Sequence, residues 1–108
     1  MPAGREDDAE SFYAGLLGLE PVPKPEALAG RGGAWFRSQG VELHLGVEED
    51  FRPARKAHPA FIVSGLAELR ARLDGAGVLL EDQPPLEGFE RLHAFDPFGN
   101  RLEFLEPA

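Results

Sequence analysis

The sequence predicts an α+β fold built from two related halves. Each half contains one helix followed by three short extended segments, and the second half also opens with a strand. The repeat has a period of about 50 residues, which indicates two copies of one supersecondary unit. At 108 residues, the chain has the length of a single domain. We expect two βαβββ modules, the first of which lacks its opening strand because residues 1–4 are too short to form one.

The first half is predicted to begin with a helix over residues 6–17. Ala9, Phe12 and Leu16 recur at helical spacing and are expected to face the core. Acidic residues in the first turns suit the helix dipole, and Gly18 is a natural stop at the carboxyl end. Three extended segments follow, at residues 19–22, 34–37 and 41–47.

The segment at 41–47 alternates between apolar and polar side chains. Val41, Leu43 and Leu45 fall on one face, and Glu42 and His44 fall on the other. This pattern is typical of a strand with one buried face.

A charged, irregular stretch at residues 49–57 is predicted to link module one (residues 1–48) to module two (residues 58–108). Module two repeats the order of elements with its opening strand present. We expect a helix at residues 66–76 and strands at 58–63, 78–81, 90–95 and 101–105.

The end of the chain carries the most specific pattern. Asp96-Pro97 starts a turn, because proline fixes φ at about −65° and aspartate bonds to the backbone beyond it. In the strand that follows, Leu102 and Phe104 point to one side and Glu103 to the other. A carboxylate in the middle of a strand is costly unless it meets water, a cation or a metal. Glu103 is therefore a candidate site residue.

The composition excludes several functions. The formal net charge of −8 argues against nucleic acid or an anionic membrane as a partner. The absence of cysteine excludes disulfides and thiolate chemistry, and no serine or glycine-rich loop has the context of a nucleophile or a phosphate site. No apolar run approaches a membrane span and no signal peptide is visible, so we expect a cytoplasmic protein.

Three stretches of the sequence form recognisable motifs. They are Ser11-Phe12-Tyr13-x-x-Leu16-Leu17-Gly18-Leu19, His58-Pro59-Ala60-Phe61-Ile62-Val63 and Asp96-Pro97-x-Gly99-Asn100-x-x-Glu103. Together they resemble the vicinal oxygen chelate superfamily, the glyoxalase/bleomycin-resistance/extradiol-dioxygenase group. The resemblance spans essentially the whole chain. It implies a pair of βαβββ modules whose curved mixed sheets enclose a concave site.

The resemblance also implies a divalent metal (zinc, iron, manganese or nickel) with ligands from the first and last strands of the modules. The matching positions of this chain hold His44, His58 and Glu103, and the missing strand would supply a fourth ligand. Glu42, on the same face as His44, is then the candidate catalytic base. Two imidazoles and one carboxylate form a common catalytic set with positions open to substrate.

Each of these residues has a simpler interpretation. His44 would then line a solvent-filled cleft, and His58 would bond the backbone at the start of its strand. Glu103 would pair with Arg91 or Arg101.

His93 and a set of pocket residues complete the candidates. His93 is either a catalytic base or hydrogen-bond donor, or a partly buried histidine with an ordinary partner. Arg55 lies in the one basic stretch and would guide an anionic substrate or simply offset the neighbouring acids. The residues expected to line an apolar substrate pocket are Trp35, Phe36 and Phe95.

Two classes of function follow. The first is a metal-dependent lyase, isomerase or dioxygenase acting on a small substrate that chelates the metal through two oxygens. The alternative is a metal-free protein that binds a small antibiotic-type molecule, as in the bleomycin-resistance branch, and a degenerate module without catalysis is the third interpretation. We expect a homodimer, because a partner chain would cover the sheet edge left by the missing strand.

Overall fold

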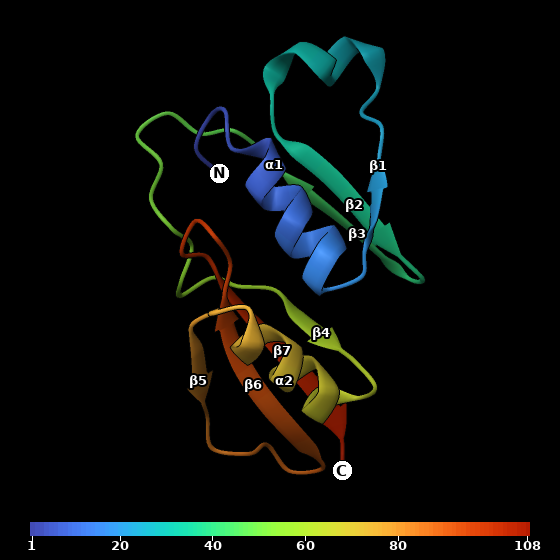
Figure 1. The fold of residues 1–108 in the computed structure, drawn as a ribbon, viewed down its shortest axis with the longest axis vertical. Helices are drawn as coiled ribbons and strands as arrows, with labels where there is room; N and C mark the ends of the chain where they lie inside the picture. Colours follow the sequence, from blue (N-terminus) through green and yellow to red (C-terminus); the bar gives the residue numbers. More distant parts are fainter. The chain divides into compact units, whose positions relative to one another are not determined.

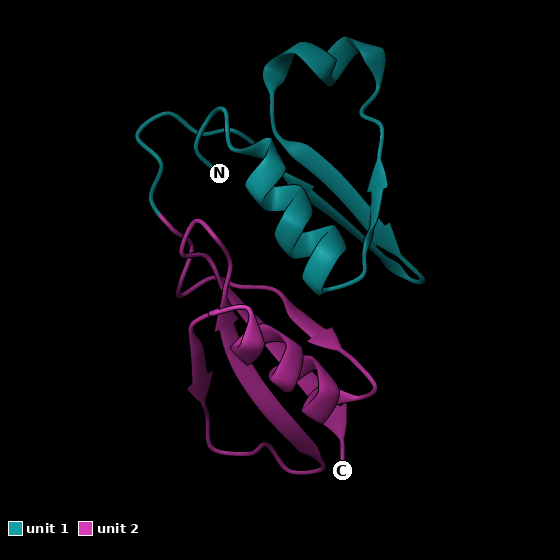
Figure 2. Ribbon diagram, viewed as in Figure 1, with its two compact units in different colours: residues 1–52 teal, residues 53–108 magenta.

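The computed structural model describes all 108 residues. It divides into two compact units, Met1–Arg52 and Pro53–Ala108, coloured separately in Figure 2. The boundary falls inside the stretch predicted to be a linker. Each unit has its own helix and its own sheet (Figure 1). None of the helices is long and apolar enough to cross a membrane.

Unit 1 begins with one continuous helical segment. The α-helix α1 (Glu6–Ala9) passes directly into the π-helix η1 (Glu10–Leu16), so the predicted helix is confirmed but its geometry is wider than expected. The wider turns bury Phe12 and Tyr13 side by side, with their ring centroids 5.0 Å apart. Leu16 was predicted to face the core together with Phe12, but it is only half-buried. The wider π-turns rotate its side chain away from the position it would have in a regular α-helix.

The helix of unit 1 covers a three-stranded antiparallel sheet of order β1-β2-β3. Its strands are β1 (Glu20–Val22), β2 (Ala34–Ser38) and β3 (Val41–Leu45). Phe36 of β2 is buried, and its ring centroid lies 5.4 Å from that of Tyr13. The predicted loop between β1 and β2 contains the 3-10 helix η2 (Glu26–Arg31), and β3 ends two residues earlier than predicted.

Met1 occupies the place of the missing opening strand. Its nitrogen donates to the Gly46 carbonyl at 2.7 Å, and its carbonyl accepts from the Glu48 N–H at 3.1 Å. These two bonds are the pattern of a parallel pairing beside the end of β3. The side chain is 5% exposed. No regular strand forms at residues 1–4, as predicted, yet one residue makes the contacts that such a strand would make.

Unit 2 has the complete βαβββ order: β4 (Ala60–Ile62), α2 (Leu66–Gly75), β5 (Leu80–Asp82), β6 (Phe89–Phe95) and β7 (Arg101–Pro107). The sheet order is β4-β7-β6-β5, with β4 parallel to β7 and the other pairs antiparallel. The prediction of a strand starting at His58 was wrong. Register pairing begins at Ala60, opposite Glu103 of β7, and the preceding Pro59 has no backbone N–H to donate to the ladder, although its carbonyl accepts from the Glu103 N–H at 3.0 Å.

The core of unit 2 lies between α2 and the sheet. Leu66, Leu69 and Leu73 of α2 are buried, as the helical spacing predicted. The helix starts at Gly65, which has a φ of +76°, and the Glu106 carboxylate of β7 accepts from the N–H groups of Gly65 and Leu66. The sheet contributes four further buried apolar residues to this core, Leu92, Ala94, Leu102 and Phe104.

The predicted turn before β7 is confirmed in detail. The Asp96 carboxylate accepts from the Phe98 N–H at 2.9 Å and the Asn100 N–H at 2.8 Å. The Asn100 amide also donates to Asp96 Oδ2 at 2.8 Å. This network fixes the turn and therefore the register of β7, so that His93 of β6 stands opposite Glu103.

Candidate functional site

Glu103 stands at the centre of a buried polar cluster in unit 2. Its carboxylate Oε1 lies 2.9 Å from His58 Nε2 and 3.2 Å from His93 Nε2. The β6–β7 register supplies His93, and the β4–β7 pairing brings in His58 two residues before the strand. The three residues each offer one ligand atom, and these atoms lie within 4.8 Å of one another.

Arg91 completes the cluster on the same face of β6 as His93. Its Nε lies 3.3 Å from Glu103 Oε2, so the ion pair weighed from the sequence is present. Burial raises the pKa of the Glu103 carboxyl, but contacts with His58 and His93 and the charge of Arg91 outweigh it. The pKa therefore lies below its ordinary value of 4.5, and the group is an anion at neutral pH.

A neutral His58 ring has too few N–H groups for the two acceptors that it faces. Its Nδ1 lies 3.0 Å from the Lys56 carbonyl, and its Nε2 lies 2.9 Å from the Glu103 carboxylate. Both partners are acceptors, and a neutral imidazole has only one N–H. One nitrogen lone pair would therefore face an oxygen lone pair. Either a second proton or a metal cation between His58 and Glu103 removes this conflict.

His93 differs from His58 in its second nitrogen. Its Nε2 lies 3.2 Å both from Glu103 Oε1 and from Arg91 Nη2, while its Nδ1 is buried without a partner. A buried N–H without an acceptor is rarer than a buried acceptor without a donor. This favours a hydrogen on Nε2, where it donates to Glu103, although Arg91 Nη2 is a second donor beside the same nitrogen. Burial lowers the pKa of His93, which favours the neutral ring.

A divalent metal fits His58 and Glu103 better than His93. Metal-binding histidines almost always donate their other N–H to a carbonyl or a carboxylate. Lys56 provides that carbonyl for His58, whereas coordination through His93 Nε2 would leave a buried Nδ1–H with no acceptor. His58 and Glu103 are therefore the better-suited donor pair of the three residues that could hold a metal ion, and the role of His58 and Glu103 as ligands stays a prediction.

His44 and Glu42 belong to unit 1, where they contact each other. His44 Nε2 lies 3.3 Å from Glu42 Oε1, and both side chains are largely exposed. The His44 ring also stacks on Trp35, its cross-strand neighbour, with centroids 3.6 Å apart and planes 6° from parallel. The roles predicted for His44 as a ligand and Glu42 as a base stay predictions.

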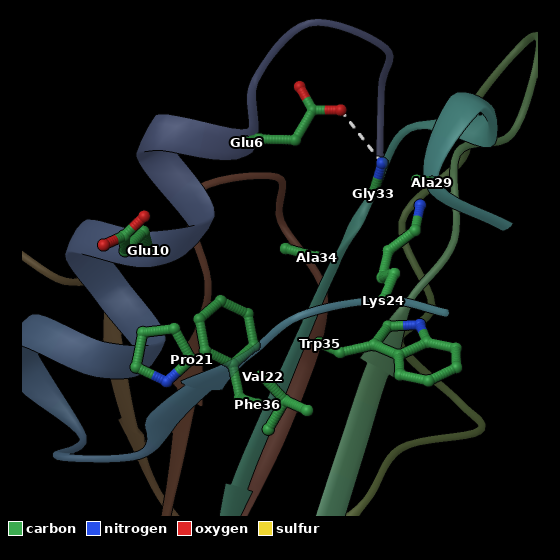
Figure 3. A pocket seen from close by; sticks show the side chains of 10 residues that line it. All are labelled: Glu6, Glu10, Pro21, Val22, Lys24, Ala29, Gly33, Ala34, Trp35 and Phe36. Carbon is green, nitrogen blue, oxygen red and sulfur yellow. Dashed lines mark hydrogen bonds between the residues drawn. The ribbon is translucent and has the colours of Figure 1, made fainter. Parts of the chain in front are cut away.

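Two of the predicted pocket residues line a hollow in unit 1. Trp35 and Phe36 take part in a depression of about 340 Å³ beside the helix (Figure 3). At one end the Glu6 carboxylate accepts from the Gly33 N–H at 2.9 Å, and Lys24 stands beside Trp35. A second hollow of about 280 Å³ shares Lys24 and Trp35 and adds Leu28, Arg31 and Leu45.

The other two predicted pocket residues, Phe95 and Arg55, meet in unit 2. The guanidinium carbon of Arg55 lies 5.6 Å from the centroid of the Phe95 ring. Arg101 takes an equivalent position on the same ring, also at 5.6 Å. Sequence reasoning considered Arg101 only as an ion-pair partner of Glu103, and the structure instead places its Nη2 3.6 Å from Glu81 Oε1.

The fold and the cluster define a protein of two related modules, each with a helix against one face of its sheet. The second module carries a carboxylate and an imidazole suited to a metal. The chain belongs to the Glyoxalase/Bleomycin resistance protein/Dioxygenase superfamily, whose family model matches residues 2–104.

Solved structures agree with this assignment. A protein from Bacillus anthracis described as belonging to the glyoxalase family is 42% identical, with a TM-score of 0.94 over 100% of this chain and 88% of that one. The fosfomycin resistance protein FosX from Listeria monocytogenes is 12% identical, with a TM-score of 0.81 over 100% of this chain and 87% of its own. An antibiotic binding protein from a Streptomyces species is 18% identical, with a TM-score of 0.76 over 100% and 91%. The last two show the fold alone. A search of curated proteins found no match.

Proposed function

We propose that this chain is a metal-dependent member of its superfamily, in which His58 and Glu103 hold a divalent cation. The proposal rests on one observation, that His58 has one N–H in its neutral form and two acceptors to satisfy. Both of its nitrogens face acceptors, at 3.0 and 2.9 Å, and a cation beside Nε2 turns the second contact from repulsive to attractive.

The spacing of the donor atoms supports the same proposal. Bonds of roughly 2.1 Å from one metal to two ligands separate the ligand atoms by roughly 3 Å at an octahedral site and by roughly 3.4 Å at a tetrahedral one. The separation of His58 Nε2 from Glu103 Oε1 is 2.9 Å. A cation held by one imidazole and one carboxylate keeps positions open for a chelating substrate.

Neighbouring residues of unit 2 hold the Glu103 carboxylate in position. Arg91 holds Glu103 Oε2, and His93 donates to Oε1, so the side chain is fixed in one rotamer. A bound divalent metal would act as a Lewis acid on two substrate oxygens. His93, whose pKa burial lowers, would stay neutral and hold the carboxylate beside that centre through Nε2. The reaction class is a lyase, isomerase or dioxygenase reaction on a small oxygen-chelating molecule.

Metal content is the test. The protein is purified without chelator or a nickel column, and its metals are measured by mass spectrometry beside the variants His58→Ala and Glu103→Gln. We expect near-stoichiometric zinc, iron, manganese or nickel in the wild type and at least tenfold less in each folded variant. Glu90→Gln is the matched control, because Glu90 is an exposed carboxylate on the neighbouring strand. Metal retained in both site variants would refute the proposal.

A metal-free binding protein is the second candidate, and two observations favour it. Glu103 already has Arg91 and His93 as partners. The hollow in unit 1 combines the apolar surfaces of Trp35 and Phe36 with Lys24 (Figure 3). Wild-type protein that binds no added metal, but whose Trp35 fluorescence responds to aromatic antibiotics, would establish this function instead.

A further inference from the structure

Two arginines share one aromatic ring in unit 2. The guanidinium carbons of Arg55 and Arg101 each lie 5.6 Å from the centroid of Phe95. Phe95 ends β6 and Arg101 begins β7, and the two residues are register partners across the hairpin. Both distances are within the range of cation–π attraction. Two positive charges are thus gathered on one ring in a chain whose net charge is −8.

The two arginines differ in their acidic neighbours. Arg55 makes no ion pair. Arg101 Nη2 lies 3.6 Å from Glu81 Oε1, which is beyond hydrogen-bond distance, and Glu81 is itself partly exposed. The Nε of Arg101 is buried and has no hydrogen-bond partner. A buried donor without an acceptor is destabilising, so this guanidinium keeps hydrogen-bonding capacity that the protein does not use.

The backbone fixes Arg55 beside the start of β7. The Ala54 N–H donates to Asn100 Oδ1 at 2.8 Å, and the Arg101 N–H donates to the Ala54 carbonyl at 2.8 Å. Gly99, with a φ of +88°, permits a close approach, because a Cβ there would lie 3.1 Å from the Pro53 ring. Arg55 is therefore carried by a segment that is bonded to the same turn as Arg101, which reduces the entropy lost on binding.

We propose that Arg55 and Arg101 form an oxyanion subsite, which takes the carboxylate or phosphate group of the substrate. A guanidinium offers two parallel N–H groups that match either group. Arg101 lies two residues before Glu103 on the same face of β7, a distance of roughly 7 Å along a strand. This inference rests on the proposed function: the substrate is a small anion whose charged group lies a few bonds from its metal-binding oxygens.

NMR of the whole chain, in buffer freed of metals by a chelating resin, tests the subsite. Inorganic phosphate and acetate are titrated separately at constant ionic strength, and the arginine Nε–H resonances are followed. We expect saturable shifts of the Arg101 Nε–H signal with at least one anion. The anion that binds more tightly decides between the phosphate and carboxylate classes.

Variants separate the subsite from general charge effects. Arg55→Gln and Arg101→Lys should each weaken anion binding at least tenfold. The second variant keeps the positive charge but loses the two parallel N–H groups of the guanidinium. Arg52→Gln is the matched control, because Arg52 is exposed in the same basic stretch, and it should leave binding unchanged. Absence of saturation, or equal loss in all three variants, would overturn the proposal. Saturable anion binding in a protein that takes up no metal would refute the metal function while keeping the subsite.

Discussion

His58 Nε2 lies 2.9 Å from Glu103 Oε1, although 45 residues separate the two in the chain. The contact follows from one parallel strand pairing, in which Ala60 of β4 stands beside Glu103 of β7. The other ring nitrogen of His58 lies 3.0 Å from the Lys56 carbonyl. The imidazole is thus held between two acceptors although a neutral ring has one N–H, an arrangement that a cation at Nε2 would stabilise.

The first prediction concerns the protonation of His93. Burial lowers its pKa below the ordinary value of 6.5, so the folded state takes up a proton less readily than the unfolded chain. The stabilising contribution of the neutral ring is present above pH 6.5 and is lost as the pH falls through the folded-state pKa. NMR titration of metal-free protein should give a midpoint below 6.5 for the ring protons of His93. A midpoint above that value would show that the contact with Glu103 dominates over burial.

The second prediction concerns the start of α2. The Glu106 carboxylate accepts from the N–H groups of Gly65 and Leu66, so it acts as a cap supplied by another strand. Glu106→Ala should lower the free energy of unfolding by about 1–2 kcal/mol, as the loss of a helix cap does. Urea denaturation measures this. Glu90→Ala is the control, because Glu90 is the cross-strand partner of Glu106 on β6 and is exposed; an equal loss in both variants would argue against capping.

The third prediction concerns the core of unit 2. Leu73 of α2 is 0% exposed, so Leu73→Ala should lower the free energy of unfolding by about 2–5 kcal/mol through lost burial and a cavity. Leu79→Ala removes the same atoms from a residue that is 64% exposed. It should change stability by less than about 0.5 kcal/mol, as surface substitutions do. Similar losses in the two variants would contradict this packing.

The fourth prediction uses the single tryptophan. Trp35 stacks on His44 with ring centroids 3.6 Å apart, so any ligand that binds the imidazole changes the surroundings of the indole. If His44 is a zinc ligand, zinc should change Trp35 fluorescence saturably, and His44→Ala should abolish the response. Zinc that binds stoichiometrically without a fluorescence change would remove His44 from the ligand set.

Local patterns were sufficient to predict most elements of the fold. The Asp96–Asn100 turn, the alternation around Glu103 and the leucine spacing of α2 depend on neighbours in the sequence, and each is confirmed. The π-helix was not predicted, because an extra residue in a turn leaves almost the same apolar spacing as an α-helix. The start of β4 was misplaced by two residues, because Pro59 at the beginning of the predicted strand has no backbone N–H for the ladder.

The candidate site was predicted less completely. Glu103 and His58 were both named, and they meet. That His93 also joins them could have been found by counting back from the Asp96–Asn100 turn, since pairing of Phe95 with Arg101 puts His93 opposite Glu103. The sharing of the Phe95 ring by Arg55 and Arg101 could not, because it depends on a segment fastened through Ala54 to a distant turn.

The measurement that tests the central claim most directly is a ¹⁵N NMR spectrum of the histidine rings before and after addition of one equivalent of zinc. We predict that His58 keeps its hydrogen on Nδ1, facing the Lys56 carbonyl, and that its Nε2 signal moves to the position of a metal-bound nitrogen. His93 should keep its hydrogen on Nε2 throughout. A His58 ring that is protonated on both nitrogens and unchanged by zinc would contradict the account, because a proton would then fill the place assigned to the metal.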